Sequence, residues 1–486
     1  MAKGVETARV YRRHQVFGLV LGPLLCMLIL ALPPPEGLSA VGWCSASIAV
    51  LMAVWWATEA LPLAATALLP LVLLPLFGIL DIEQAAAPFA NPLIFLFLGG
   101  FLIALAVQRW GLHRRIALHI LLRVGGRPLN LVAGVMLATA ALSMWISNTA
   151  ATMMMMPIAA SLIAITYRGG GESAGSGANF AAAMMLGTAY AASIGGMATL
   201  IGSPPNALVA GYLMQNSAIE LTFVRWMLVA TPITIVMLPL AWLILTRVVF
   251  PFPNENVGAQ TNAVPQMVEA MGPISVPEKR VALVFGAVAT GWIVHPLISN
   301  VLGTATITDT SIAIAGAITL FVVPADWQKR DFLLDWETAR KVPWEILILF
   351  GGGLSLAQGM DRSGLASWLG GGLDFLIGAP PIFIVAGVAL FAILLTELMS
   401  NTATTAALLP VVGALAVSTE LTPLILAACV SLGASSAYML PVATPPNAIV
   451  FGSGHVTLPQ MMRAGVLLSL VGIVIITGGL MLFVGG

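Results

Sequence analysis

Charged side chains are scarce in this chain. Asp, Glu, Lys and Arg make up 8% of its 486 residues, whereas soluble domains carry about 25%. So few charges cannot cover a water-exposed surface, and 59% of the residues are hydrophobic. The sequence therefore predicts an all-α polytopic membrane protein. Basic and acidic residues balance at 20 each, so no basic domain is available for nucleic acid.

Cysteine and histidine are also rare. The three cysteines (Cys26, Cys44 and Cys429) lie in apolar runs and lack the paired spacing of a disulfide framework or a zinc site. The five histidines are scattered, and no H-E-x-x-H motif is present. No nucleophile and base are paired either. We therefore expect neither an enzyme nor an organic cofactor.

Long apolar runs dominate the chain, and a membrane-crossing helix needs about 20 such residues. Two segments, 129–167 and 382–418, are too long for one span and too short for two. We expect each to enter and leave on the same side as a re-entrant hairpin. Eleven other runs are candidate spans, near 15–33, 41–58, 62–79, 88–107, 180–216, 225–250, 281–299, 309–324, 343–360, 423–454 and 463–485.

The basic residues indicate how these segments thread, because cytoplasmic loops are rich in Lys and Arg. With two re-entrant hairpins, all of the 20 basic residues except Arg225 and Arg362 lie in the cytoplasm. If the first hairpin crossed the membrane instead, Arg168 and the residues up to the second hairpin would change sides. The N-terminus, with Lys3, Arg9, Arg12 and Arg13, is thus expected in the cytoplasm, and Gly486 outside.

Three segments are too polar or too short to span. The stretches 113–126 and 362–376 are expected to lie along the membrane surface as amphipathic helices. The linker 251–280 is rich in Pro, Asn and Gly and is expected to be a cytoplasmic loop between two halves.

The two halves share motifs in the same order. The triplets Ser147-Asn148-Thr149 and Ser400-Asn401-Thr402 each follow a hydroxyl residue, Ser143 or Thr396, at the same spacing. "IGSPPNALVAG" then corresponds to "VATPPNAIVFG" further along. By the charge distribution the two copies insert in opposite directions. Inverted repeats with interrupted helices are typical of secondary transporters, whose binding site lies near the membrane midplane.

The prolines explain why these helices are interrupted. Pro204–Pro205 and Pro445–Pro446 remove amide donors and disfavour helix before them. Freed carbonyls cannot be satisfied by lipid, but together with hydroxyls they can hold a small hard cation. We expect Asn148 or Thr149, and the matching Asn401 or Thr402, to be the N-caps of the hairpin arms that follow. The free amides there attract an anion.

The paired triplets and "PPNA" elements resemble the divalent anion:sodium symporter family of di- and tricarboxylate transporters over nearly the whole chain. The resemblance implies a homodimer with scaffold and transport domains, elevator-like alternating access, eleven spans and two re-entrant hairpins. It implies one sodium ion at Ser143, Ser147, Asn148 and Gly202, and a second at Thr396, Met399, Ser400, Asn401 and Ala443. It places the substrate against Asn148, Thr149, Asn401 and Thr402, beside Ser203, Pro204, Thr444 and Pro445.

The same resemblance divides the chain into scaffold and transport parts. The scaffold comprises 1–128 and 217–381, and the transport halves are 129–216 and 382–486. The first transport half contains the hairpin 129–167 and the broken helix 180–216. The second contains the hairpin 382–418, the broken helix 423–454 and the last helix 463–485.

The leading functional hypothesis is sodium-coupled transport of C4-dicarboxylates such as succinate, malate and fumarate across a bacterial inner membrane. Sodium-independent exchange, or transport of citrate or sulfate, remains open within the same fold. An intramembrane hydrolase would need a paired nucleophile and base, and a receptor would leave the repeat unexplained. For the intramembrane carboxylates Glu59 and Glu397 a structural hydrogen-bonding role is favoured, and Met153–Met156 are interpreted as adaptable packing.

Overall fold

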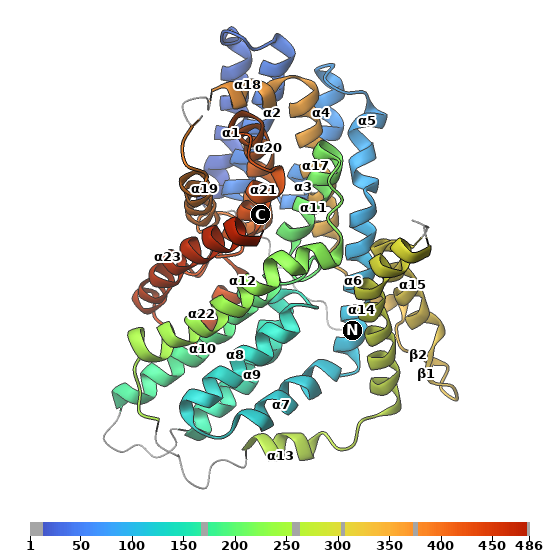
Figure 1. Ribbon diagram of the computed structural model, residues 1–486, viewed down its shortest axis with the longest axis vertical. Helices are drawn as coiled ribbons and strands as arrows, with labels where there is room; N and C mark the ends of the chain where they lie inside the picture. The colour runs from blue at the N-terminus through green and yellow to red at the C-terminus, as the bar shows by residue number, and fades with distance from the viewer. Residues whose placement is uncertain (1–12, 167–173, 255–262, 303–306, 373–377, 484–486) are drawn as a thin grey trace, which may run out of the picture.

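The computed structural model describes residues 13–166, 174–254, 263–302, 307–372 and 378–483. Part of the orientation prediction rests on residues outside these ranges, namely Lys3, Arg9, Arg12, Arg168 and Gly486. The described chain is almost entirely helical (Figure 1). Its one sheet is a short antiparallel pair, β1 (Pro324–Asp326) and β2 (Asp331–Phe332), which the sequence did not indicate.

Eight helical segments of the described residues are at least 18 residues long and apolar enough to cross a membrane. They make the chain an all-helical polytopic membrane protein, as predicted. They are α1 (Arg13–Ala31), α2 (Ala40–Thr58), the run α5 (Ile82–Ala86), η1 (Ala87–Ala90) and α6 (Pro92–Arg109), then α9 (Asn148–Thr166), α10 (Ala174–Met197), α12 (Phe223–Leu243) with η2 (Ile244–Val249), α20 (Asn401–Thr419) and α23 (Leu458–Phe483).

The other helices are mostly shorter. They are α3 (Leu63–Ala67), α4 (Pro70–Leu76), α7 (Leu112–Val124), α8 (Pro128–Ser143), α11 (Pro204–Ser217), α13 (Ala263–Ala270), α14 (Val276–Leu302), α15 (Asp309–Val322), α16 (Trp336–Ala339), α17 (Trp344–Arg362), α18 (Leu365–Gly371), α19 (Pro381–Thr396), α21 (Pro423–Ala434) and α22 (Pro445–Gly452).

Two expectations need correction. The candidate span 62–79 is not one helix but α3 and α4, because the chain leaves helix before Pro70 and restarts there. The linker 251–280 is not wholly loop, since it contains α13. The stretches 113–126 and 362–376 do form helices, α7 and α18, in their described parts.

The two motif-bearing halves pack in the same way. Helices α8 and α9 form a helical hairpin against α10, and α19 and α20 form one against α21. The halves then exchange partners: α9 packs against α22, and α20 against α11. Small residues permit the close approach, because a Cβ on Gly195 of α10 would lie 2.4 Å from the Ala140 carbonyl oxygen of α8. Both broken helices are thus placed beside both hairpins.

The remaining helices form a second group. In Figure 1, α1 to α5, α17 and α18 lie in the upper part, with α20 and α21 of the second half among them, away from α7 to α10 at the lower left. Helix α15 packs along α6, with Gly99 against the Ala313 backbone, and α17 packs along α3 and η1. Helix α12 packs instead on α10 and α23.

Candidate functional site: two hairpin tips beside two helix breaks

The first hairpin turns at residues 144–147, between α8 and α9. The Ser143 hydroxyl, at the end of α8, lies 2.7 Å from Oδ1 of Asn148, the first residue of α9. The same hydroxyl lies 2.7 Å from the carbonyl oxygen of Ala192 on α10. One buried hydroxyl therefore joins the hairpin tip to the helix that breaks beside it.

The second hairpin repeats this arrangement at residues 397–400. The Thr396 hydroxyl lies 2.8 Å from Asn401 Oδ1 and 2.8 Å from the Ala434 carbonyl oxygen on α21. The sequence repeat is thus also a repeat of side-chain contacts.

Oxygen atoms gather around the Asn148 amide. Its Oδ1 position lies 2.7 Å from Ser143 Oγ, 3.1 Å from the Ala192 carbonyl oxygen and 3.2 Å from that of Gly202. Such a cluster is stable if the amide turns its NH2 group inward, or if a cation lies among the oxygens. These separations are hydrogen-bond distances, and they match an amide whose NH2 group faces the three oxygens. Ligands about 2.4 Å from a hard cation and at right angles are roughly 3.4 Å apart, so the oxygens would separate slightly to admit one. The cluster unites three of the four residues predicted for the first sodium ion.

Ser147, the fourth predicted ligand, has a different contact. Its hydroxyl accepts a hydrogen bond from the Ala150 amide at 3.3 Å, so Ser147 caps α9. Ser400 is the N-cap residue of α20. The prediction that Asn148 or Thr149, and Asn401 or Thr402, would be the caps is wrong by one position. They are the first two helical residues, so the free amides of both helix N-termini still lie at the tips.

The first break, residues 198–203, is held by the Asn206 side chain. Its amide nitrogen donates to the Gly196 and Thr199 carbonyls at 2.9 and 2.7 Å, and its oxygen accepts from Ser431 of α21 at 2.7 Å. Trp226 of α12 donates to the Met197 carbonyl at 2.8 Å. Side chains therefore satisfy the carbonyls released by the break, as membrane burial requires.

The second break, residues 435–444, is held by a carboxylate. Glu397 accepts hydrogen bonds from the backbone amides of Tyr438, Met439 and Leu440 at 2.7, 2.9 and 3.0 Å. Asn447 donates to the Leu440 carbonyl at 3.0 Å, as Asn206 does in the first half. Glu397 thus has the structural role favoured from the sequence.

Glu59 differs from that expectation. It is exposed at the end of α2, in left-handed conformation with φ of 48°. Its backbone carbonyl accepts from Gln15 at 3.1 Å, so the backbone rather than the carboxylate makes this contact.

In the first half, the hairpin tip is connected to the unwound segment by a hydroxyl group instead of a carboxylate. Met144 occupies the position equivalent to Glu397, and its carbonyl accepts a hydrogen bond from the Thr199 hydroxyl. Both halves therefore tie the hairpin tip to the unwound segment, one through a hydroxyl and one through a carboxylate.

The remaining predicted residues surround these clusters. Ser203 and Thr444 are buried at the starts of α11 and α22, where Thr444 accepts from the Asn447 amide at 3.2 Å. The other predicted residues lie on the tips or at the breaks, without a hydrogen bond to the two asparagine clusters; they are Thr149, Pro204, Met399, Ser400, Thr402, Ala443 and Pro445. The carbonyls of Ala192 and Ala434 were missed, because no side chain marks a backbone ligand in a sequence.

Known proteins resemble the chain over almost its whole length. A family model described as the sodium:sulfate symporter transmembrane region matches residues 13–484. The sodium-dependent dicarboxylate transporter SdcS of Staphylococcus saprophyticus is 40% identical over 470 residues, covering 96% of this chain and 91% of that protein. Its namesake from Staphylococcus aureus USA300 is 42% identical over 466 residues, covering 95% and 90%.

A solved structure shares the fold at much lower identity. The YdaH transporter of Alcanivorax borkumensis is 16% identical, with a TM-score of 0.57, and covers 96% of this chain and 98% of its own. At that identity the likeness shows a common fold alone.

Proposed function

Since the chain belongs to the sodium:sulfate symporter family, we propose that it couples sodium entry to the transport of C4-dicarboxylates such as succinate, malate and fumarate. It is a multi-pass membrane transporter and not an enzyme. The staphylococcal relatives, named as sodium-dependent dicarboxylate transporters, support this substrate class. The observation that carries the proposal is the hydroxyl–asparagine–carbonyl arrangement that occurs once at each hairpin tip.

The sodium ions are co-transported with the substrate, and one binds at the hydroxyl–asparagine–carbonyl cluster of each hairpin tip. The first ion is held by oxygens of Ser143, Asn148, Ala192 and Gly202, with Ser147 at the same tip. The second is held by the equivalent tip, whose ligands are Thr396, Met399, Ser400, Asn401, Ala443 and the carbonyl of Ala434. Hydroxyl, amide and carbonyl oxygens suit a hard cation.

The dicarboxylate binds between the two tips. Its carboxylates meet the helix N-termini at Asn148–Thr149 and Asn401–Thr402, with the starts of α11 and α22 beside them. Segments 129–166, 174–216 and 382–454 contain no Lys or Arg. The charge of the substrate is therefore balanced by the sodium ions and by the N-terminal amides.

Transport follows from motion of one helix group past the other. The hairpins, the broken helices and α23 form the transport domain, and α1 to α7 with α13 to α18 form the scaffold. Helix α12 moves with the transport domain, because Trp226, Thr231 and Thr234 all hydrogen-bond to α10 or its break. This extends the first transport half beyond its predicted end at 216. The protein is a homodimer, and each subunit has eleven spans and two re-entrant hairpins. Its transport domain moves past the scaffold by an elevator-like alternating-access mechanism.

The orientation is that given by the basic residues, with the N-terminus in the cytoplasm of a bacterial cell and the C-terminus outside. Arg127, at the start of the first hairpin, then faces the cytoplasm, and Arg225 faces outward. A single cysteine at either position, in a chain without native cysteines, tests this with a membrane-impermeant label. Labelling of position 127 in intact cells would contradict the threading.

The function is tested by uptake of labelled succinate into proteoliposomes. A sodium gradient should drive accumulation, and a competitor panel of malate, fumarate, citrate and sulfate defines the substrate range. The alternative, sodium-independent exchange, is measured with potassium outside and unlabelled succinate inside. Uptake in the second experiment equal to that in the first would contradict sodium coupling.

A further inference from the structure

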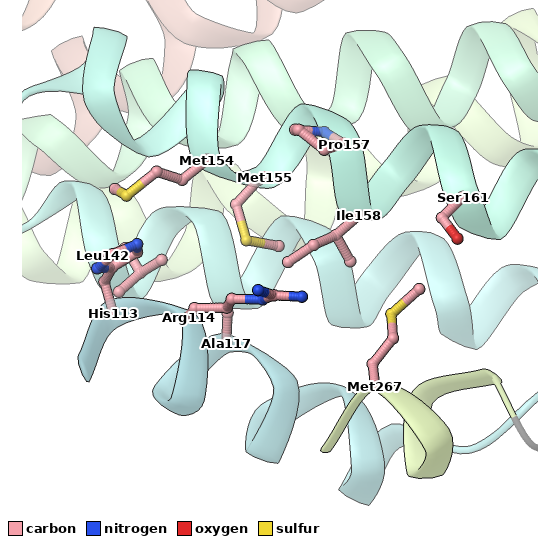
Figure 2. Close-up of a pocket in the computed structure, with 10 residues that line it drawn as sticks. All are labelled: His113, Arg114, Ala117, Leu142, Met154, Met155, Pro157, Ile158, Ser161 and Met267. Atoms are coloured by element: carbon pink, nitrogen blue, oxygen red, sulfur yellow. The ribbon is translucent and has the colours of Figure 1, made fainter. Parts of the chain in front are cut away.

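A cavity of about 440 Å³ lies between α7, the hairpin of α8 and α9, and α13. It reaches Leu142, next to Ser143, but none of its lining residues belongs to the sodium or substrate sites. Its size is within the range of small-molecule sites, about 300–1,000 Å³. Met154, Met155 and Ile158 line it from α9, and Met267 from α13 (Figure 2). Two of these residues come from the run Met153–Met156, which neither the sodium sites nor the substrate site uses.

Arg114 of α7, an exposed residue, places a positive charge at the edge of this mostly apolar cavity, next to His113. Figure 2 shows its guanidinium directed toward Met155 and Ile158. Within the described residues it has no ion pair or hydrogen bond. The next residue is a contrast, because Arg115 pairs with Glu278 at 2.9 Å and donates to the Gly272 carbonyl at 3.0 Å. Glu278 is thus paired with Arg115, and the exposed guanidinium of Arg114 is available to a ligand.

The cavity requires a ligand with one negative end and an apolar body. A guanidinium binds carboxylate or phosphate through paired hydrogen bonds. Flexible, polarisable methionines adapt to apolar ligands of varied shape. Succinate matches this lining less well, because a short molecule with a carboxylate at each end has no apolar body to cover Met154, Met155 and Ile158.

We propose that this cavity binds an anionic amphiphile, with its charged head on Arg114 and its acyl chain between Met154, Met155 and Met267. Two membrane components have this chemistry: a free fatty acid and an anionic phospholipid. The walls of the cavity belong to a hairpin arm on one side and to α7 and α13 on the other. An occupant therefore links the hairpin to its neighbours and slows its motion, so it inhibits transport. That consequence rests on the proposed function, whereas the binding does not.

The experiment measures binding directly by photolabelling. The whole protein in nanodiscs of neutral lipid is exposed to a long-chain fatty acid carrying a diazirine, and labelled peptides are mapped. Labels should fall on α9 around residues 154–158 and on α13. Arg114→Gln should weaken labelling about tenfold, the effect of one lost charge-assisted pair. Met267→Glu changes a half-buried residue of α13 and should also weaken labelling. The new carboxylate would repel the anionic head of the probe or pair with Arg114 in its place.

The matched control is Arg123→Gln, on the same helix. Arg123 is exposed, and within the part of the chain that the structure describes it donates only to the His119 carbonyl, at 3.2 Å. This variant should therefore label as the unmodified protein does. Equal labelling of the Arg114→Gln and Met267→Glu variants and the unmodified protein would overturn the proposal. Equal labelling by a diazirine alcohol of the same length would also overturn it, since the head charge would then be irrelevant.

Competition identifies the source of the ligand. Unlabelled decanoate should displace the probe if a free fatty acid is the natural ligand, and phosphatidylglycerol in the nanodisc should displace it if a phospholipid is. Decanoate should also inhibit sodium-driven succinate uptake in the unmodified protein but not in Arg114→Gln. Displacement without inhibition would leave the site standing and contradict its effect on the hairpin.

Discussion

Gly196 lies so close to Asn148 that a Cβ on Gly196 would be 2.2 Å from Oδ1 of the asparagine amide. Gly196→Ala should therefore displace the amide from the oxygen cluster around Ser143. Overpacking of this kind costs about 1–3 kcal/mol, which corresponds to roughly 5- to 150-fold in affinity. We expect the sodium concentration for half-maximal uptake to rise by that factor.

Gly175→Ala is the control for this substitution. Gly175 lies on the same helix and has open space where its Cβ would be. Sodium activation should be unchanged, and helix propensity should favour the variant slightly. A Gly196→Ala protein with normal sodium activation would show that the Asn148 amide does not bind the ion.

The hydroxyls of Ser143 and Thr396 should matter equally, because each joins an asparagine to a broken helix. Ser143→Ala and Thr396→Val should each weaken sodium activation by about tenfold, since a hydroxyl ligand and its contact to a carbonyl are lost together. The control is Thr139→Val on α8, whose hydroxyl, among the described residues, bonds only within its own helix, to the Val135 carbonyl at 2.7 Å. A lower transport rate with an unchanged sodium curve would indicate packing instead.

Glu397→Gln should destabilise the second half. A glutamine can present only one oxygen to the three backbone amides that the carboxylate now satisfies. Each buried donor left unpaired costs about 1–3 kcal/mol, so the melting temperature of the purified protein should fall. The exposed Glu345 provides the comparison, and Glu345→Gln should melt as the unmodified protein does. Equal melting of both variants would refute the structural role of Glu397.

The ion pair of Arg115 and Glu278 predicts a dependence on pH. Burial alone would raise the pKa of Glu278, but hydrogen bonds from Arg115 and Ser275 outweigh it and hold the pKa below its ordinary value of 4.5. A lowered pKa stabilises the folded protein above pH 4.5, and the contribution is lost as pH falls through the folded pKa.

Arg115→Gln should therefore lower the melting temperature at pH 7, by breaking a pair whose side chains are only 12% and 9% exposed. The loss should shrink as the pH falls below 4.5 and through the folded pKa of Glu278, where protonation removes the pair from the unmodified protein too. Arg123→Gln should show neither effect. A melting difference for Arg115→Gln that is independent of pH would contradict the assignment to Glu278.

The sequence was sufficient for most of the long apolar helices and for the positions of the tips and breaks, since each rests on local chemistry. Pro204–Pro205 and Pro445–Pro446 predict the breaks because proline removes amide donors, and the triplets predict the tips because they interrupt apolar runs. Ser143 and Thr396 could be identified by their equal spacing from the triplets. All of these signals lie within one short stretch of chain.

What the sequence could not give depends on helix register and on contacts between distant elements. The Ala192 carbonyl is a ligand candidate only because α10 turns it toward Ser143, and an alanine carries no sign of that. The capping positions were shifted by one residue for the same reason. In the sequence, Glu397 has no counterpart in the first half. The structure shows that the Thr199 hydroxyl takes its place there, because it connects the hairpin tip to the unwound segment.

The absence of a basic side chain at the hairpins leads to the last prediction. A dicarboxylate brought there carries two negative charges, and only helix N-termini and bound cations are available to balance them. Succinate should therefore bind after sodium, and replacing sodium by choline should weaken it by about 5- to 150-fold, the usual range of coupling between two sites. A thermal-shift titration of the purified protein with succinate measures this in both salts. Coupling is reciprocal, so succinate should tighten sodium binding by the same factor. The same succinate affinity in choline would mean that the amides and polar side chains suffice, and it would favour sodium-independent exchange.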